Sequence, residues 1–168
     1  KEISVVAYKD RTGIGIVAVV ENEHRNNILY RSIVPTTASP EQEAQAIDYT
    51  RRILEAADYY GVLTVEFFIS QGRVIFNEMA PRVHNSGHIT MQSANKSQFR
   101  AHIEAICGLE VGPIQNQATT LYNILGQDLS YFLKLIQERP AHLHLYEKEP
   151  RQDRKIGHIN FPGHIRLE

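Results

Sequence analysis

The sequence predicts an α+β fold in which a mainly antiparallel sheet packs against helices. Runs of β-branched residues joined by short turn sequences fill much of the first 80 positions, and segments with helical spacing of apolar residues follow them. With 168 residues and 42% hydrophobic composition, the chain can bury one sizeable core, or one core plus a small appendage. Residues 108–117 have the composition of a linker, so we predict one unit over 1–111 and a small β-rich unit over 112–168.

The first third of the chain is predicted to form a hairpin, a third strand and a long helix. The strands occupy residues 3–8, 14–20 and 28–34. Ser39 is placed to cap the helix, with Pro40 at its first position and Gln42 completing a capping box. Apolar residues then recur at helical spacing as far as Tyr60, and Gly61 is expected to end the helix.

The rest of the chain is predicted to alternate strands and short helices. The strands lie at 62–69, 74–78, 118–125, 142–146 and 158–161, and the helices lie at 97–107 and 129–138. The first of these helices is expected to turn Phe99, Ile103 and Ile106 inward. His142 and His144 alternate along one strand and are expected to face solvent.

Composition and charge exclude several classes of protein. The net charge of −1 gives no basic face for a nucleic acid, and no apolar run approaches the 18 residues of a membrane span. The single cysteine, Cys107, excludes an internal disulfide and favours the reducing cytoplasm. The chain begins with a strand-like segment and without an initiator Met, so we expect it to be a fragment of a longer protein.

Two glutamates interrupt apolar strands and suggest a cation site. Glu66 lies within the strand at 62–69, and Glu78 ends the next strand. A three-residue loop between them would pair Phe68 with Phe76 and place Glu66 opposite Glu78, whereas a two-residue loop would place Glu66 opposite Asn77. Opposed carboxylates repel unless a cation such as Mg²⁺ lies between them, so a shared face requires an odd loop or a bulge. The alternative is an edge hairpin whose glutamates point into water.

A dense polar loop follows the second of these strands. It contains Arg82, His84, Asn85, Ser86 and His88. A forked cation, imidazoles, an amide and a hydroxyl suit a phosphorylated, hydroxyl-rich ligand. Zinc binding by the two histidines is disfavoured, because Pro81 and Gly87 oppose a helix and no cysteine or third histidine lies nearby. An ordinary surface connection remains the alternative.

The most basic stretch of the chain lies near its end. Its cations are Lys148, Arg151, Arg154 and Lys155, and acidic residues are interspersed among them. A solvated mixed-charge loop is one interpretation. The other is an anion site in which Arg154 and one lysine hold a phosphate.

These residues resemble the ATP-grasp superfamily, and within it the 5-(carboxyamino)imidazole ribonucleotide synthetases, the ATPase subunit of phosphoribosylaminoimidazole carboxylase. The segments that carry the resemblance are 2–4, 21–25, 61–68, 77–88 and 154–158. The Asn-Glu strand end is common to ATP-grasp enzymes, whereas the continuation Ala-Pro-Arg-x-His-Asn-Ser-Gly-His is specific to the synthetases. The resemblance implies the carboxy-terminal half of an ATP-grasp fold, followed by a small barrel-like domain.

The resemblance also implies a role for each group of site residues. Glu66 and Glu78 would ligate Mg²⁺ that bridges the ATP phosphates. The nucleotide side would be lined by Glu2, His24, Asn77 and Glu78. The ribonucleotide would be contacted by the catalytic Arg82 and by His84, Asn85 and Ser86. Its 5′-phosphate would be bound by Lys148 and by Arg154 or Lys155.

The implied reaction belongs to de novo purine biosynthesis. ATP would phosphorylate bicarbonate to carboxyphosphate, and the amine of aminoimidazole ribonucleotide would capture the carboxyl group as a carbamate. The family also implies a cytoplasmic homodimer. Because the amino-terminal domain and the subdomain whose lysines close over the phosphates are absent here, we expect the isolated chain to be inactive.

One departure and two alternatives accompany this interpretation. Gln152-Asp153 stands where the resemblance leads us to expect Pro-Gly, which leaves the phosphate ligands open. Another ATP-grasp ligase, such as a formate-dependent glycinamide ribonucleotide transformylase or a biotin carboxylase, would share the carboxylate pair. A non-catalytic binding or dimerisation module would leave both glutamates solvated.

Overall fold

The computed structural model describes residues 1–167, which form an α+β fold around one eight-stranded antiparallel sheet. The strands are β1 (Glu2–Asp10), β2 (Gly13–Arg25), β3 (Ile28–Val34), β4 (Gly61–Ser70), β5 (Arg73–Ala80), β6 (Thr119–Leu125), β7 (His142–Leu145) and β8 (Lys155–Pro162). The helices are α1 (Pro40–Ala56), α2 (Thr90–Ser93), α3 (Gln98–Ile106) and α4 (Leu129–Glu138), with 3-10 turns η1 (Ser86–Ile89) and η2 (Gly126–Asp128). The strand order is β5-β4-β1-β2-β3-β6-β8-β7, which confirms the predicted fold class.

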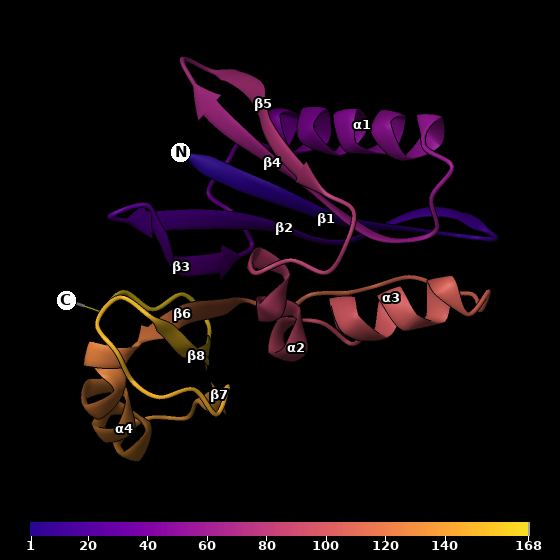
Figure 1. Cartoon of the computed structure of the whole chain (residues 1–168). Helices are drawn as coiled ribbons and strands as arrows, with labels where there is room; N and C mark the ends of the chain where they lie inside the picture. Colours follow the sequence, from indigo (N-terminus) through magenta and orange to yellow (C-terminus); the bar gives the residue numbers. More distant parts are fainter. Residues whose placement is uncertain (168) are drawn as a thin grey trace.

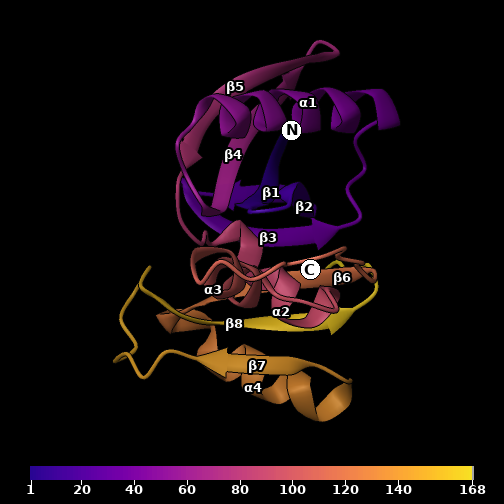
Figure 2. The same ribbon diagram turned by 90° about the vertical axis from the view of Figure 1, so that its right-hand side faces the viewer.

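The amino-terminal part of the sheet is covered on both faces (Figures 1 and 2). Helix α1 covers one face, and η1, α2 and α3 cover the other. Successive residues of β1 alternate between the two cores: Val5 packs in the cluster that contains Leu54 of α1, and Val6 packs in the cluster that contains Ala101 of α3. The second of these faces becomes polar towards the start of β1, and the candidate site lies there.

Helix α1 has the predicted start but an earlier end. Ser39 Oγ accepts a hydrogen bond from the Gln42 backbone N–H, and Gln42 Oε1 accepts one from the Ser39 backbone N–H, so the capping box is confirmed. The helix ends at Ala56, because Ala57 is extended and Lys9 Nζ donates to the carbonyls of Leu54 and Ala57. In a longer helix these carbonyls would accept hydrogen bonds from backbone N–H groups of the next turn, and here Lys9, distant in sequence, donates to them instead.

Replacing Ser39 with alanine is expected to lower the free energy of unfolding of the chain by about 1 kcal/mol, since the Gln42 backbone N–H loses its capping partner. Urea unfolding followed by circular dichroism measures the change. Ser70→Ala removes an exposed hydroxyl and is the control, expected to stay within about 0.5 kcal/mol of wild type. Equal effects of the two substitutions would show that the cap contributes nothing.

Helix α3 turns a different face inward from the one predicted. It buries Gln98, Ala101 and Ala105, whereas Ile103 and Ile106 are 56% and 52% exposed. The prediction for these two isoleucines was wrong, because the small alanines at i and i+4 allow a close approach to the sheet, and apolar spacing alone favoured the bulkier face. Phe99 is half-buried and stacks on His88, with ring centres 5.5 Å apart.

The sheet continues beyond the segment predicted to be a linker. Strand β6 pairs with β3, and β8 and β7 extend the sheet, with α4 packing Phe132 and Leu135 into their core. Strand β8 begins at Lys155, three residues before the predicted start. The division of the chain at residues 111–112 stays a prediction. None of the helices in residues 1–167 is long and apolar enough to cross a membrane.

His142 and His144 differ in their surroundings. His142 is exposed, as predicted. The prediction for His144 was wrong, because its ring stacks on that of His158 with centres 4.6 Å apart and 19° between planes. The pairing of β7 with β8 places His144 directly opposite His158.

Candidate active site

A β-bulge brings the two glutamates to the same face. The turn between β4 and β5 holds two residues, 71 and 72, rather than the three that would pair Phe68 with Phe76. The bulge directly after Glu66 shifts the register by one residue, so Glu66 lies opposite Glu78. The predicted opposition of the two carboxylates is therefore confirmed, with the bulge as its cause.

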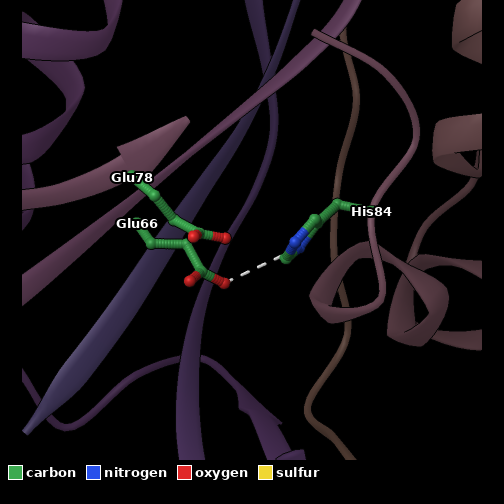
Figure 3. A group of neighbouring side chains, drawn as sticks. All are labelled: Glu66, Glu78 and His84. Carbon is green, nitrogen blue, oxygen red and sulfur yellow. Dashed lines mark ion pairs between the residues drawn. The ribbon is translucent and has the colours of Figure 1, made fainter. Parts of the chain in front are cut away.

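Glu66, Glu78 and His84 form a compact cluster (Figure 3). One ligand atom of each lies within 4.8 Å of the others, and no other such group of three occurs in residues 1–167. The two carboxylates lie side by side on β4 and β5, and the His84 ring points towards them from the following loop, with Nδ1 3.7 Å from Glu66 Oε1. Glu66 is only 8% exposed, which contradicts the alternative in which it points into water, whereas Glu78 is exposed.

Burial raises the pKa of Glu66 to about 7. The carboxylates of Glu2 and Glu78 contribute to this rise in pKa, and the hydrogen bond from Ser4 Oγ opposes it. The cluster thus concentrates negative charge in a partly buried place, where a bound cation would relieve the repulsion.

A row of small polar residues supports Glu66 across four strands. Ser4 Oγ donates to Glu66 Oε1 at 3.3 Å, and Asn22 Nδ2 donates to Ser4 Oγ at 2.6 Å. Ser32 Oγ in turn donates to Asn22 Oδ1 at 3.0 Å. Ser4, Asn22 and Ser32 were missed in the sequence. Ser4 stands out only as a polar residue in an apolar strand, whereas Asn22 lies among charged residues, and which face the three share depends on register.

The residues assigned to the nucleotide side lie beside this row. His24 Nδ1 is 3.7 Å from Glu2 Oε1, and Asn22 Nδ2 donates to the same oxygen at 3.3 Å. Glu2, Asn22 and His24 line a hollow of about 410 Å³ together with Lys1, Asn27 and Phe68. Asn77 is exposed on β5, and no hydrogen bond within residues 1–167 joins it to this hollow.

The polar loop is held by a buried glutamine at the start of α3. Gln98 is fully buried, and its Oε1 accepts from the His84 backbone N–H at 2.9 Å while its Nε2 donates to the His84 carbonyl at 2.7 Å. A Cβ on Gly87 would lie 2.1 Å from Gln98 Oε1, so this close approach requires glycine. Gln98 was missed, because nothing in its sequence context distinguishes it from a surface helix residue.

The side chains of the loop divide into two sets. Ser86 is buried and its Oγ lies 2.8 Å from His84 Nδ1, while Arg82 and Asn85 are exposed. Burial lowers the pKa of His84, and the charge of Arg82 lowers it further, so His84 is neutral near pH 7. His88 does not join His84 around one point, because its Nδ1 lies 3.3 Å from the Tyr146 hydroxyl instead.

The basic stretch reaches the polar loop through one of its lysines. Lys155 Nζ donates to Asn85 Oδ1 at 3.2 Å, and burial together with the charge of Lys148 lowers the pKa of Lys155 to about 8. Arg154 is exposed, and no side-chain hydrogen bond or ion pair joins it to this loop in the described part of the chain. Asp153 has a φ of 58°, a conformation that glycine favours and aspartate tolerates, so the departure from Pro-Gly is compatible with the same turn.

Taken together, the site offers carboxylates that can hold a cation beside a loop whose side chains can bind an anion. The opposed carboxylates can bind a divalent cation. Lysine, amide, imidazole and arginine groups on the loop side can bind and orient anions.

Two family models match the chain. The ATP-grasp domain matches residues 1–99, and the phosphoribosylaminoimidazole carboxylase C-terminal domain matches residues 119–166. Among curated relatives, N5-carboxyaminoimidazole ribonucleotide synthase of Vibrio parahaemolyticus is 39% identical, over 98% of this chain and 45% of the relative. The chain therefore spans about 45% of the length of the curated relatives it matches.

Solved structures of the same group superpose closely on this chain. N5-carboxyaminoimidazole synthetase from Staphylococcus aureus complexed with ADP has a TM-score of 0.89 at 35% identity, covering 96% of this chain and 45% of that one. The synthase of Aspergillus clavatus in complex with ADP and 5-aminoimidazole ribonucleotide has a TM-score of 0.89 at 29% identity, covering 96% and 46%. The predicted resemblance is confirmed. The chain belongs to the ATP-grasp family, in the group that carries the phosphoribosylaminoimidazole carboxylase C-terminal domain.

Proposed function

We propose that the protein containing this chain is an ATP-dependent ligase that carboxylates 5-aminoimidazole ribonucleotide to its N5-carboxy form in purine biosynthesis. The observation that carries the proposal is the placement of Glu66 directly opposite Glu78, facing a loop that presents His84. A carboxylate pair with anion-binding groups beside it suits a reaction between a nucleotide and a second phosphorylated substrate. The relatives named as synthases, one with ADP and the ribonucleotide bound, support this assignment.

Mg²⁺ is the cation that best fits the donor set. Carboxylate oxygens are its preferred protein ligands, and Glu66 and Glu78 offer one from each strand. His84 Nδ1 already has Ser86 Oγ as a neighbour at 2.8 Å, so we assign His84 to the substrate side. When bound, Mg²⁺ would neutralise charge on the phosphoryl group in transfer. Ser4 holds the Glu66 carboxylate in orientation by its hydrogen bond.

The chain's residues would bind the two substrates on opposite sides of the carboxylates. Glu2, His24 and Asn77 are assigned to ATP. Arg82, His84, Asn85 and Ser86 are assigned to the ribonucleotide and to bicarbonate, with Arg82 stabilising the developing negative charge. Bicarbonate oxygen attacks the γ-phosphorus to give ADP and carboxyphosphate. The ribonucleotide amine then attacks the carboxyl carbon, and phosphate and a proton leave.

Bicarbonate and the phosphorylated ribonucleotide are both anions, so they would react only if the site aligns them. Neutral His84, held through its backbone by Gln98, would orient the bicarbonate without a charge of its own. Lys155 would bind the phosphate of the ribonucleotide, with Lys148 and Arg154 in the same stretch. Because both substrates are already held in position, the entropy cost of bringing them together is met on binding and not during the reaction. A cytoplasmic homodimer is part of the proposal.

The proposal is tested by ADP release from the full protein that contains this chain. We expect ADP release to require bicarbonate and aminoimidazole ribonucleotide together with Mg²⁺. Glycinamide ribonucleotide with formate, and biotin with bicarbonate, are the comparison acceptors and should give no ADP above background. Turnover with either comparison acceptor alone would overturn the assignment in favour of another ATP-grasp ligase. The isolated 168-residue chain should give no turnover with any acceptor, because it covers under half of its relatives.

A further inference from the structure

Two lysines from different parts of the basic stretch each lie near the same aromatic ring. The ammonium groups of Lys148 and Lys155 each lie 5.7 Å from the ring centre of Tyr146. Neither lysine forms an ion pair in residues 1–167, so their charges are not offset by a carboxylate. Two ammonium groups held near one ring favour an anion between them, and the ring face attracts both.

Glu149 and Asp153, two of the acidic residues of the same stretch, are engaged elsewhere. Glu149 pairs with Arg151 at 3.3 Å, and Asp153 Oδ1 accepts from Gln127 Nε2 at 3.0 Å. The mixed-charge composition of the stretch therefore does not neutralise the two lysines. The interpretation of this stretch as a uniformly solvated loop does not account for Lys155, which is half-buried against Asn85.

Tyr146 is itself fixed at both ends. Its backbone N–H donates to the Ile156 carbonyl at 2.9 Å, which ties it to β8 just beyond the last residue of β7. Its hydroxyl lies between His158 Nδ1 and His88 Nδ1, the latter at 3.3 Å. Burial raises the pKa of Tyr146 to about 12, so the phenol keeps its proton.

A stack of aromatic side chains lies behind the tyrosine. The rings of His144 and His158 are 4.6 Å apart, those of His158 and His88 are 5.3 Å apart, and His88 stacks on Phe99 at 5.5 Å. Burial lowers the pKa of His158 to about 3 and that of His88 to about 4, so these two rings are uncharged near pH 7. The rings of His88 and His158 beside Tyr146 therefore add no positive charge to that of the two lysines.

We propose that Tyr146 is a positioning residue that holds Lys148 and Lys155 together as a clamp for a phosphoryl dianion. The proposal rests on the proposed function, in which that dianion is the phosphate of the ribonucleotide. The ring attracts both ammonium groups, and the charge of Lys148 acts on Lys155. The hydroxyl supplies the anchor that keeps the ring in place.

The test uses ribose 5-phosphate as the probe, titrated into the 168-residue chain and followed by NMR. Tyr146→Leu removes the ring and is expected to raise the dissociation constant about tenfold, from the loss of two cation–π contacts. Tyr146→Phe keeps the ring and loses the hydroxyl, so its dissociation constant should stay within about twofold of wild type while its melting temperature falls. Tyr60→Leu is the matched control, because Lys9 lies 5.8 Å from the Tyr60 ring centre, outside the site.

A second measurement needs no substitution. In the wild-type chain, the ε-methylene protons of Lys148 and Lys155 should be shifted upfield by the ring of Tyr146, and those of exposed Lys134 should not. This chemical-shift measurement still tests the proposal if Tyr146→Leu fails to fold.

The outcomes separate the inference from the proposed function. Loss of affinity in Tyr146→Leu, with retention in Tyr146→Phe and Tyr60→Leu, supports the clamp. Equal affinity in wild type and Tyr146→Leu, or parallel losses in the Leu and Phe variants that follow their stability, overturns the inference and leaves the proposed function standing. A wild-type chain that does not bind the probe at all overturns the phosphate site and the inference with it.

Discussion

Replacing Glu66 with glutamine is expected to lower turnover of the full protein by at least about 100-fold. Glutamine keeps the shape of the side chain and can still accept the hydrogen bond from Ser4, but it brings no negative charge to the cation. Glu78→Gln is expected to act in the same direction, since the two carboxylates face one point. The coupled ADP-release assay measures the loss at saturating Mg²⁺.

The same substitution is expected to stabilise the chain when divalent cations are absent. At pH 8 wild-type Glu66 is ionised beside Glu78 and Glu2, and relief of this repulsion is worth up to about 1 kcal/mol. Mainly through burial, the pKa of Glu66 is raised from 4.5 to about 7, so the destabilising effect of its charge develops as the pH rises between these two values and is fully present above pH 7. The gain in Glu66→Gln should therefore be full at pH 8 and absent at pH 4, as measured by urea unfolding.

Opposite signs for activity and stability are what distinguish a functional carboxylate from a structural one. Glu138→Gln, at an exposed position of α4, is the control and should change neither quantity. If Glu66→Gln destabilises the chain at pH 8, or leaves turnover intact, the carboxylate pair is a structural feature. The alternative of a non-catalytic module would then regain support.

Replacing Gln98 with leucine is expected to lower the free energy of unfolding by about 3 kcal/mol. The change leaves the backbone N–H and carbonyl of His84 without partners in a buried place, at a cost of about 1–3 kcal/mol for each group. Turnover of the full protein should also fall, because His84 loses the contacts that hold it beside Glu66. Amide hydrogen exchange at His84 gives the local readout, and the amide should lose protection.

The control for this variant is Gln137→Leu, at an exposed position of α4, which should stay within about 0.5 kcal/mol of wild type. The expected pattern is a large loss of stability in Gln98→Leu together with deprotection of His84. Unchanged protection at His84 would mean that the loop is held by other contacts, such as the hydrogen bond from Thr90 Oγ1 to the Gly87 carbonyl.

Local signals in the sequence predicted most of the fold. The capping box at Ser39 and the hairpin turns depend on residues close in the chain, and they are confirmed. The end of α1 and the buried face of α3 were predicted less well. Each was decided by a distant partner: Lys9 binds the end of α1, and the sheet packs against the alanines of α3.

The candidate site divides in the same way. Glu66 and Glu78 stand out because charge within an apolar strand requires an explanation, and the bulge that aligns them follows from the short turn. Gln98 and Tyr146 do not stand out, because their roles arise from contacts with residues 14 and 12 positions away or more. Such contacts depend on the folded chain and leave no pattern in the sequence.

Paramagnetic broadening by Mn²⁺ tests the central claim, that Glu66 and Glu78 together hold a divalent cation beside the polar loop. Mn²⁺ with ADP, added in small amounts to the chain, should first broaden the amide signals of Glu66, Glu78 and His84 and leave those of α4 sharp. Glu66→Gln should abolish this selective broadening. Broadening centred on the acidic residues of the stretch around Glu149, or unchanged by Glu66→Gln, would contradict the account.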